Sequence, residues 1–254
     1  MRPQATYFGA NGWLLEIADC RVLVDPWLSG PLVFPPGAWM LRGELPHPWP
    51  VPENLDLLLL TQGLADHSHQ PSLKLLPRNL PVVGSTAAAK VVARLGFEHI
   101  ETLKPGETCT VKALSIEATA GAAVPNVENG YLLDWAGGSL YLEPHGVLDP
   151  KLASRPVDTV ITPVVDLGLP LAGDFITGAS VLPDLIQRFT PRTVLASTTG
   201  GDVTFTGLIS ALLSGAEIKE QHDPDPRVVI PVPGEPFKLE THAESQDRVN
   251  TAKP

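Results

Sequence analysis

The stretch that most constrains this chain is residues 57–70, where an apolar run meets a polar loop. Four consecutive leucines are followed by Thr61, and the polarity then changes abruptly. An apolar run this short, bounded by turn residues, predicts a strand that is buried on both faces. The loop after it carries Asp66, His67 and His69. Because sites in layered α/β folds lie at the carboxyl ends of strands, we expect a functional site here.

The charge balance narrows the classes of partner. The chain of 254 residues has 18 Lys and Arg against 28 Asp and Glu, a formal net charge of −10. An acidic chain without a basic cluster predicts no nucleic-acid partner and no anionic membrane partner. No apolar segment approaches the roughly 20 residues of a membrane helix. We expect a small-molecule substrate or ligand, and the sequence indicates no particular oligomeric state.

The two cysteines bear on the cellular compartment. Cys20 and Cys109 have neither the spacing of a metal site nor the density of a disulfide scaffold. This usage favours a reducing compartment. The first residues also lack the apolar core of a signal peptide. We therefore expect a cytoplasmic protein.

The amino-terminal segment reads as antiparallel strands. Residues 5–17 predict a hairpin turning at Asn11-Gly12, because both central residues of a type I′ turn need a positive φ. A third strand, residues 21–24, ends at Asp25. Residues 28–54, rich in proline and tryptophan, are long for a connection, and such loops are often lids or binding loops.

Helices alternate with strands over the rest of the chain. Residues 87–95 predict a helix capped by Ser85 or Thr86, followed by a glycine that ends it. A later helix is expected over residues 180–189, interrupted by Pro183. Short strands separated by such helices indicate an α/β protein.

The order of these motifs resembles the metallo-β-lactamase superfamily. The shared features are an early hairpin, an Asp-Pro after the third strand, and a Thr-His-x-His-x-Asp-His loop after an apolar strand. Thr61, Asp66 and His67 match that loop, whereas Gln62 and Leu64 stand in place of its first two histidines. A Pro-Gly-Glu turn and an Asn-Gly-Tyr strand start extend the resemblance to about residues 5–235.

The resemblance implies a fold of class α/β (α+β), a four-layer αββα sandwich. In such a fold two mixed sheets pack face to face and the helices lie outside. Each half alone would leave a sheet face exposed, so we expect one domain over residues 1–240. Residues 28–54 would be a loop insertion in it, and residues 241–254 a polar, flexible tail.

The resemblance also implies metal ligands, of which this chain lacks several. The first metal of the superfamily binds three histidines, which are replaced here by Gln62, Leu64 and the glycine-alanine run 121–123. The second metal keeps Asp66 and His67, but no histidine follows the strand at residues 193–197. At most one metal site therefore remains.

One rearranged site is the expectation that follows. Glu143 stands where the superfamily has a bridging Asp, and His145, or His69, is placed to fill the gap left by the last histidine. Asp66, His67, Glu143 and His145 together make a donor set for one Zn, Mn or Fe ion. The alternative is that these four form a metal-free, hydrogen-bonded cluster.

Three further residues are expected to support the ligands. In the superfamily the Asp of Asp-Pro lies beneath the metal loop, which would give Asp25 this role. The alternative is that Asp25 only caps the end of its strand. Thr61 and His69 are expected beside the ligands. If the chain is catalytic, Asp66 or Glu143 would hold or deprotonate a water.

Two functions follow from the resemblance. The first is a metal-dependent hydrolase with a degenerate, at most mononuclear site, acting on a small ester, lactone, amide or phosphodiester. The second is a catalytically inactive protein of the same fold that binds a small molecule or a protein partner in the cleft that holds the metals in active members.

Overall fold

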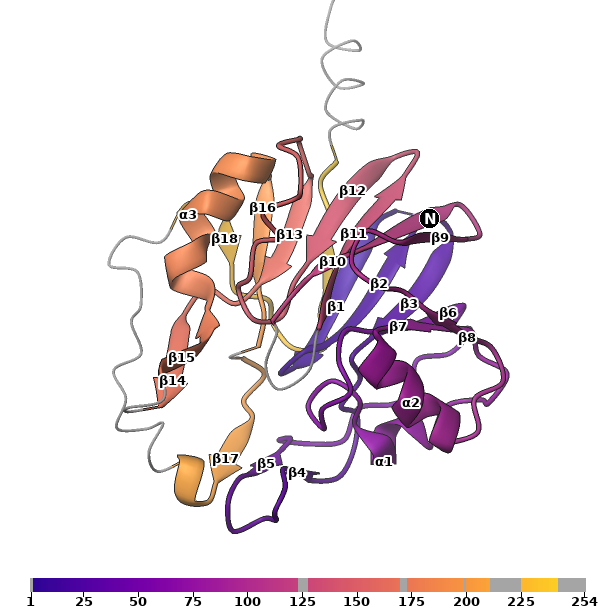
Figure 1. Ribbon diagram of the computed structural model, residues 1–254, viewed down its shortest axis with the longest axis vertical. Helices are drawn as coiled ribbons and strands as arrows, with labels where there is room; N and C mark the ends of the chain where they lie inside the picture. Colours follow the sequence, from indigo (N-terminus) through magenta and orange to yellow (C-terminus); the bar gives the residue numbers. More distant parts are fainter. Residues whose placement is uncertain (1, 123–127, 170–172, 199, 211–224, 242–254) are drawn as a thin grey trace, which may run out of the picture.

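Two seven-stranded sheets lie face to face in the computed structural model (Figure 1). It describes residues 2–122, 128–169, 173–198, 200–210 and 225–241. The first sheet runs in the order β19 (Pro236–Lys238), β1 (Gln4–Gly9), β2 (Gly12–Ile17), β3 (Cys20–Val24), β6 (Leu57–Leu60), β7 (Val82–Gly84) and β8 (Ile100–Thr102). The second runs in the order β18 (Val228–Val229), β16 (Thr193–Ala196), β13 (Thr159–Thr162), β12 (Gly138–Leu142), β11 (Asn129–Trp135), β10 (Leu114–Ala120) and β9 (Thr108–Val111).

The two sheets repeat one pattern of strand direction. In the first sheet the pairs from β19 to β3 are antiparallel, and the pairs from β3 to β8 are parallel. In the second, β9 to β12 pair antiparallel and β12 to β18 pair parallel. Parallel neighbours need crossover connections, and these connections carry the helices.

The core between the sheets is built by alternate residues of the strands. Leu57 and Leu59 of β6 face this core with Trp13 of β2, whereas Leu58 and Leu60 face the opposite way, into the helical layer. The second sheet contributes Tyr131 and other buried residues to the same core. The leucine run is therefore a strand buried on both faces, as the sequence predicts.

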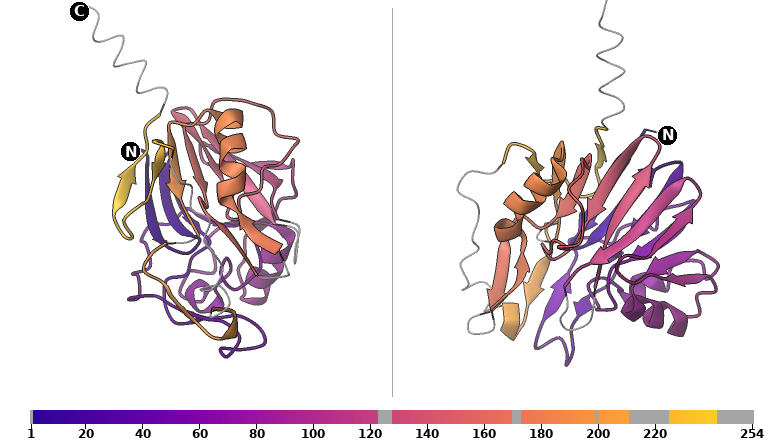
Figure 2. Two further views of the ribbon diagram at one scale, coloured as in Figure 1. Left: turned by 90° about the vertical axis from the view of Figure 1, so that its left-hand side faces the viewer. Right: turned by 45° about the horizontal axis from the view of Figure 1, so that its top comes forward.

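Helices cover the outer faces of both sheets (Figure 2). The helices α1 (Gln70–Leu73) and α2 (Thr86–Arg94) lie on the first sheet, and α3 (Gly178–Phe189) lies on the second. The hydroxyl of Ser85 accepts a hydrogen bond from the amide of Ala88 at 3.3 Å, which confirms it as the cap of α2. The four-layer αββα sandwich is thereby confirmed.

Helix α3 differs from the prediction in two ways. It begins at Gly178, two residues earlier than expected, and it continues through Pro183 without interruption. Its buried face, which includes Leu182, Leu185 and Phe189, packs on the second sheet. We attribute the tolerance of the proline to this packing, which outweighs the loss of one backbone hydrogen bond.

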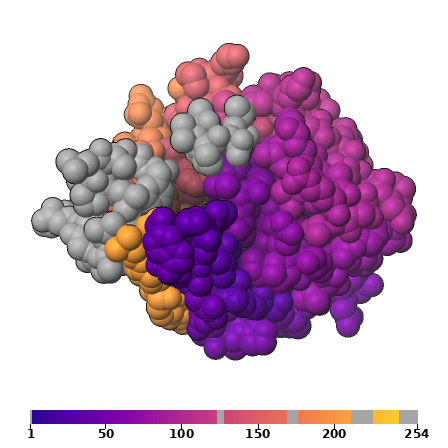
Figure 3. All heavy atoms as spheres, turned by 60° about the horizontal axis from the view of Figure 1, so that its bottom comes forward, coloured from indigo at the N-terminus to yellow at the C-terminus, as the bar shows by residue number. Residues whose placement is uncertain are grey.

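The segment at residues 28–54 contains two short strands of its own. Strands β4 (Leu32–Val33) and β5 (Arg42–Glu44) pair with each other, and β17 (Thr204–Thr206) adds to β5. This joins an early segment to a late one on one face of the molecule (Figure 3). The remaining strands, β14 (Asp166–Leu169) and β15 (Gly173–Thr177), form a hairpin that leads into α3.

Of the polar tail predicted over residues 241–254, residues 242–254 lie outside the described residues. Within the described part of the chain, no helix is both long and apolar enough to cross a membrane.

Candidate metal centre

The loop after β6 turns sharply and buries His67. The carbonyl of Leu64 accepts hydrogen bonds from the amides of His67 and Ser68, at 3.1 and 2.7 Å. The hydroxyl of Ser68 donates to the carbonyl of Gln62 at 2.6 Å. These bonds fold the polar half of the loop back on itself, so that the imidazole of His67 is fully buried at the end of the sheet.

One side of the His67 ring is fixed by Asp25 and Thr61. The Nδ1 atom of His67 lies 2.8 Å from Oδ2 of Asp25 and 3.0 Å from the hydroxyl of Thr61. Asp25 also accepts hydrogen bonds from the amide of Thr61, at 2.8 Å, and from its hydroxyl. A carboxylate on Nδ1 selects the ring orientation that aims Nε2 into the site. The structure thus places Asp25 and Thr61 behind His67.

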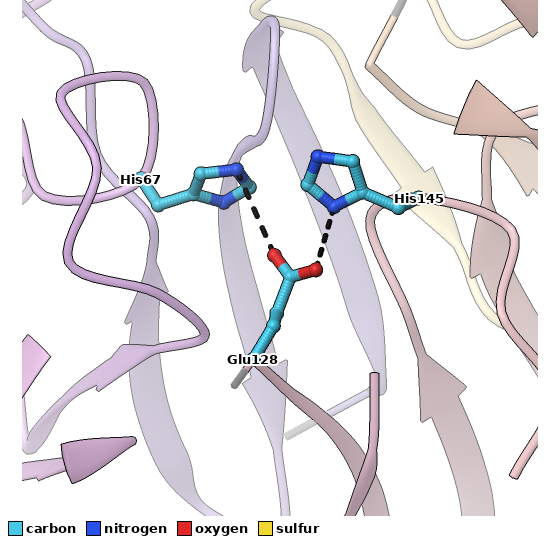
Figure 4. Close-up of side chains that lie close together, drawn as sticks. All are labelled: His67, Glu128 and His145. Atoms are coloured by element: carbon cyan, nitrogen blue, oxygen red, sulfur yellow. Dashed lines mark ion pairs between the residues drawn. The ribbon is translucent and has the colours of Figure 1, made fainter. Parts of the chain in front are cut away.

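The other side of the ring meets two carboxylates. The Nε2 atom of His67 lies 3.2 Å from Oδ2 of Asp66 and 3.8 Å from Oε1 of Glu128. The second oxygen of Glu128 lies 2.7 Å from Nδ1 of His145. Figure 4 shows the carboxylate of Glu128 between the two imidazoles. The ligand atoms of His67, Glu128 and His145 all lie within 4.8 Å of one another.

The opposite charges in this cluster shift one another's pKa values. Burial disfavours the charged form of His67, but Asp66 and Asp25 outweigh it and hold the pKa of His67 well above its usual range. Burial likewise opposes charge on Asp66, yet His67 and His145 lower its pKa. His145 is also buried, and Glu128 raises its pKa. The carboxylates thus favour the protonated form of both imidazoles.

Glu143 occupies the base of the loop that carries His145. Its Oε2 atom accepts hydrogen bonds from the amides of His145 and Val147, at 3.1 and 2.6 Å. Its Oε1 atom is buried and has no hydrogen-bond partner among the described residues. Burial, and next the charge of Glu128, raise the pKa of Glu143 to about 7. One of its oxygens thus holds the loop backbone.

His69 lies in a different environment from the other histidines. Its Nδ1 atom contacts the hydroxyl of Ser72 at 2.9 Å, and its Nε2 atom contacts the carbonyl of Pro31 at 3.2 Å. Burial lowers the pKa of His69. Both ring nitrogens therefore tie α1 to the segment at residues 28–54.

Glu128 is the residue that sequence reasoning missed. Its amide donates to the carbonyl of Ala122, and its carbonyl accepts from the amide of Gly121, at 2.9 and 3.1 Å. A Cβ atom on Gly121 would lie 3.2 Å from Cγ of Glu128. Glu128 thus lies directly across from Gly121 and Ala122, where the superfamily has a histidine. The available signal was an acidic residue immediately before the strand that becomes β11.

Asn11 is a second residue near the cluster that sequence reasoning read differently. The predicted hairpin is present, but positive φ angles occur at Gly9 and Ala10, of 99° and 48°, and not at Asn11. The shifted turn turns the Asn11 side chain inward, where its amide lies 3.4 Å from Nε2 of His67. The hydroxyl of Thr198, in the loop after β16, contacts Oδ1 of Asn11 at 3.1 Å.

The donor chemistry of this cluster fits a divalent metal ion. Two imidazoles and two carboxylates are the ligands that Zn, Mn and Fe ions accept in proteins. Oδ1 of Asp66 is buried without a hydrogen-bond partner in the described part of the chain, and so is Oε1 of Gln62. Orphaned buried oxygens of this kind call for a missing cation or water.

The fold and this cluster define the class of protein, which is a metallo-β-lactamase fold with a carboxylate–histidine centre. The family described as "Beta-lactamase superfamily domain" matches residues 4–198. Because this match covers well over half of the sequence, the chain belongs to that family.

Two relatives are named UPF0173 metal-dependent hydrolase. The one from Paracoccus denitrificans is 28% identical over 148 residues, and one from Cereibacter sphaeroides is 30% identical over 147 residues. Each match covers 54% of this chain and 60% of the relative. The chain thus spans about 60% of the length of these curated relatives.

Solved structures support the same fold. The isothiocyanate hydrolase from Delia radicum gut bacteria superposes with a TM-score of 0.65 at 17% identity, covering 94% of this chain and 99% of that one. The metallo-beta-lactamase fold protein YhfI from Bacillus subtilis gives a TM-score of 0.56 at 15% identity, covering 94% of this chain and 100% of that one. At these identities the likeness concerns the fold alone.

Proposed function

We propose that this protein is a metal-dependent hydrolase with one divalent metal site. The ligands would be His67, Asp66, Glu128 and His145, and the ion Zn²⁺, Mn²⁺ or Fe²⁺. The observation that carries the proposal is the carboxylate of Glu128, which lies between two buried imidazoles at 2.7 and 3.8 Å. In this assignment Glu128 takes the place that the sequence suggested for Glu143.

The residues of the chain have separate tasks in this centre. Asp25 holds Nδ1 of His67 and so keeps Nε2 aimed at the ligand position. Glu143 holds the amides of His145 and Val147 and so positions His145. A divalent ion bound here supplies Lewis acidity and lowers the pKa of water. Asp66, whose Oδ1 atom has no hydrogen-bond partner in the described part of the chain, is the proposed acceptor of the proton from water.

The substrate class is a further part of the proposal. We propose a small ester, lactone, amide or phosphodiester, because these are the bonds that such a centre hydrolyses. The net charge of −10 disfavours a nucleic acid. Cys20 and Cys109 are both free thiols, which supports a cytoplasmic location. The orphaned carboxylate oxygens and the relatives' name support a hydrolase over an inactive binding protein.

Metal analysis tests the centre. We expect protein dialysed against Zn²⁺ or Mn²⁺ to retain one ion per chain by elemental analysis. His67→Ala should abolish this binding, whereas His69→Ala should keep it, since both nitrogens of His69 have structural partners. Two retained ions, or retention in His67→Ala, would show that the ligands are assigned wrongly.

A substrate panel tests the activity. Ester, lactone, β-lactam and phosphodiester substrates should be screened with each ion, with and without a chelator. We expect hydrolysis that needs metal and is lost in Asp66→Ala. Turnover that survives both the chelator and Asp66→Ala would defeat the proposed centre, and a metal-loaded protein inactive on every substrate would favour the binding protein.

A further inference from the structure

We propose that Asn11 is a further ligand of this centre, binding the metal through its side-chain carbonyl oxygen. The inference rests on the proposed function, because it assigns a role toward the metal of that site. It concerns a residue in the turn between β1 and β2, far in sequence from the other donors. Three independent observations lead to it: the spacing of the polar atoms, the hydrogen bonding of Thr198, and the rigidity of the turn.

The spacing is that of atoms around one small ion. The amide end of Asn11 lies 3.4 Å from Nε2 of His67 and 3.5 Å from Oδ2 of Asp66, and those two atoms are 3.2 Å apart. Ligand atoms about 2.0–2.2 Å from one ion with four or five ligands lie roughly 2.8–3.8 Å from one another. The three atoms are therefore spaced as neighbouring ligands of one ion would be, and Oε1 of Glu128 lies 3.8 Å from the same His67 nitrogen.

The hydroxyl of Thr198 decides which end of the amide faces this shell. This hydroxyl lies 2.8 Å from the carbonyl of Pro144 and 3.1 Å from the outer end of the Asn11 amide. A hydroxyl has one proton to donate. If that proton goes to Pro144, at the shorter distance, the atom of Asn11 at Thr198 must be a donor, which is the NH₂ group. The structure places Nδ2 of Asn11 inward and its Oδ1 toward Thr198. Because the two ends of an amide have the same shape, this inventory favours the exchanged assignment, with the carbonyl oxygen inward.

The inward oxygen creates a need for a cation. Oxygen of Asn11 and oxygen of Asp66 would then face each other at 3.5 Å with no proton between them. Two acceptors in a buried site repel each other unless positive charge lies between them. A divalent ion between the two oxygens meets this need.

The turn that carries Asn11 is held rigidly. The amide of Thr198 donates to the carbonyl of Ala10 at 2.8 Å, and the amide of Ala10 donates to Gly200 at 3.3 Å. Thr198 has a φ of 73°, an unusual conformation for a β-branched residue. Such backbone strain persists where the surroundings over-determine it, often at functional sites. The turn therefore presents the buried side chain of Asn11 in one position.

Substitutions at Asn11 separate a ligand from a hydrogen-bond donor. Binding of Zn²⁺ and Co²⁺ should be measured by competition with a chromophoric chelator in wild type, Asn11→Ala, Asn11→Asp and Thr198→Val. A ligand oxygen is lost in Asn11→Ala, which should weaken binding about 10–100-fold. Asn11→Asp keeps an oxygen and adds charge, so it should bind at least as tightly as wild type. Thr198→Val removes the orienting hydroxyl and should weaken binding about 10-fold.

The control is Asn54→Asp, which makes the same charge change at an exposed residue with a φ of 53°. It should bind metal as wild type does, and far-UV circular dichroism in chelator should show that each variant is folded. Asn11→Asp binding as weakly as Asn11→Ala would show that Asn11 acts through its N–H, and overturn the inference. Wild-type affinity in Asn11→Ala would overturn it while leaving the proposed function intact. A wild-type protein that binds neither ion would overturn both.

Discussion

Glu143 is a buried carboxyl group whose proton affinity differs between the folded and unfolded states. Its pKa rises from 4.5 to about 7 because of burial and of the nearby Glu128. Between those two values the folded protein keeps a proton that the unfolded chain has released. The contribution of Glu143 to stability is therefore complete below about pH 4.5 and is lost as the pH rises through about 7.

Glu143→Gln should consequently change the pH dependence of stability. Glutamine copies the protonated form and still accepts the hydrogen bonds from His145 and Val147. Urea unfolding in chelator should give similar stabilities for variant and wild type at pH 5. At pH 8 the variant should be more stable by as much as about 3 kcal/mol. A difference that shrinks with rising pH would contradict this account of Glu143.

Asp25 acts on the metal through His67 and not by contact. Asp25→Asn keeps the shape of the side chain but removes the negative charge beside Nδ1 of His67. We expect metal affinity to fall about 10–100-fold, as for other partners of metal-bound histidines. Chelator competition measures this. Asp56→Asn is the matched control, because Asp56 lies at the opposite end of β6 from the His67 loop and pairs with Lys112. Equal affinity in Asp25→Asn and wild type would remove this role from Asp25.

The residues whose mutual proximity could be predicted are those that share a short motif or end neighbouring strands. Asp66 and His67 are adjacent in one loop, and Thr61 and Asp25 end neighbouring strands, so linear order placed all four together. Glu128 was missed because strand pairing, and not spacing, brings it across from Gly121. The register with which β10 pairs with β11 is not readable from the sequence.

At the scale of elements, the first hairpin and the loop after β16 touch through two glycines. A Cβ atom on Gly201 would lie 2.3 Å from Cα of Gly9, and Gly201 has a φ of 94°. Both backbones therefore approach more closely than any side chain permits. This contact joins the turn of Asn11 to the loop of Thr198.

Gly201→Ala should destabilise the protein by more than the cost of placing alanine at a positive φ. We expect a loss of about 2–4 kcal/mol in urea unfolding, since the added methyl group must displace backbone. Gly96→Ala is the matched control: its φ is 85°, but nothing lies within 4 Å of the added Cβ. That variant should lose only about 1 kcal/mol. Equal losses in the two variants would show that the contact is not tight.

Helices and strands could be predicted where apolar residues recur in the sequence with a regular period. The β6 leucines, the Ser85 cap and the hairpins follow from local rules. The uninterrupted helix α3 does not follow from these rules, because packing of its buried face on the sheet outweighs the helix-breaking effect of Pro183. Pairing of β17 with β5 joins residues more than 150 positions apart, and no local pattern encodes such a contact.

At the scale of the whole molecule, one core is shared by both sheets. Trp13 and Leu59 from the first sheet pack with Tyr131 and Leu195 from the second. Neither sheet keeps a buried inner face without the other, so the predicted single domain should unfold as one unit. Hydrogen-exchange mass spectrometry over a urea series should show peptides of β2 and β11 losing protection together. Separate midpoints would indicate two domains.

The pairing of the last described strand with the first has a consequence for synthesis on the ribosome. Strand β1 is made early, but its outer edge has no partner until residues 236–238 emerge, because β19 is that partner. An open strand edge is a template for association with other chains. Strand β19 then forms the edge of the sheet, and this edge is a poor template for pairing with other chains. Pro236 has no N–H to donate, and Lys238 brings a charge. A variant that lacks residues 236–238 should therefore self-associate in size-exclusion chromatography while it still binds metal.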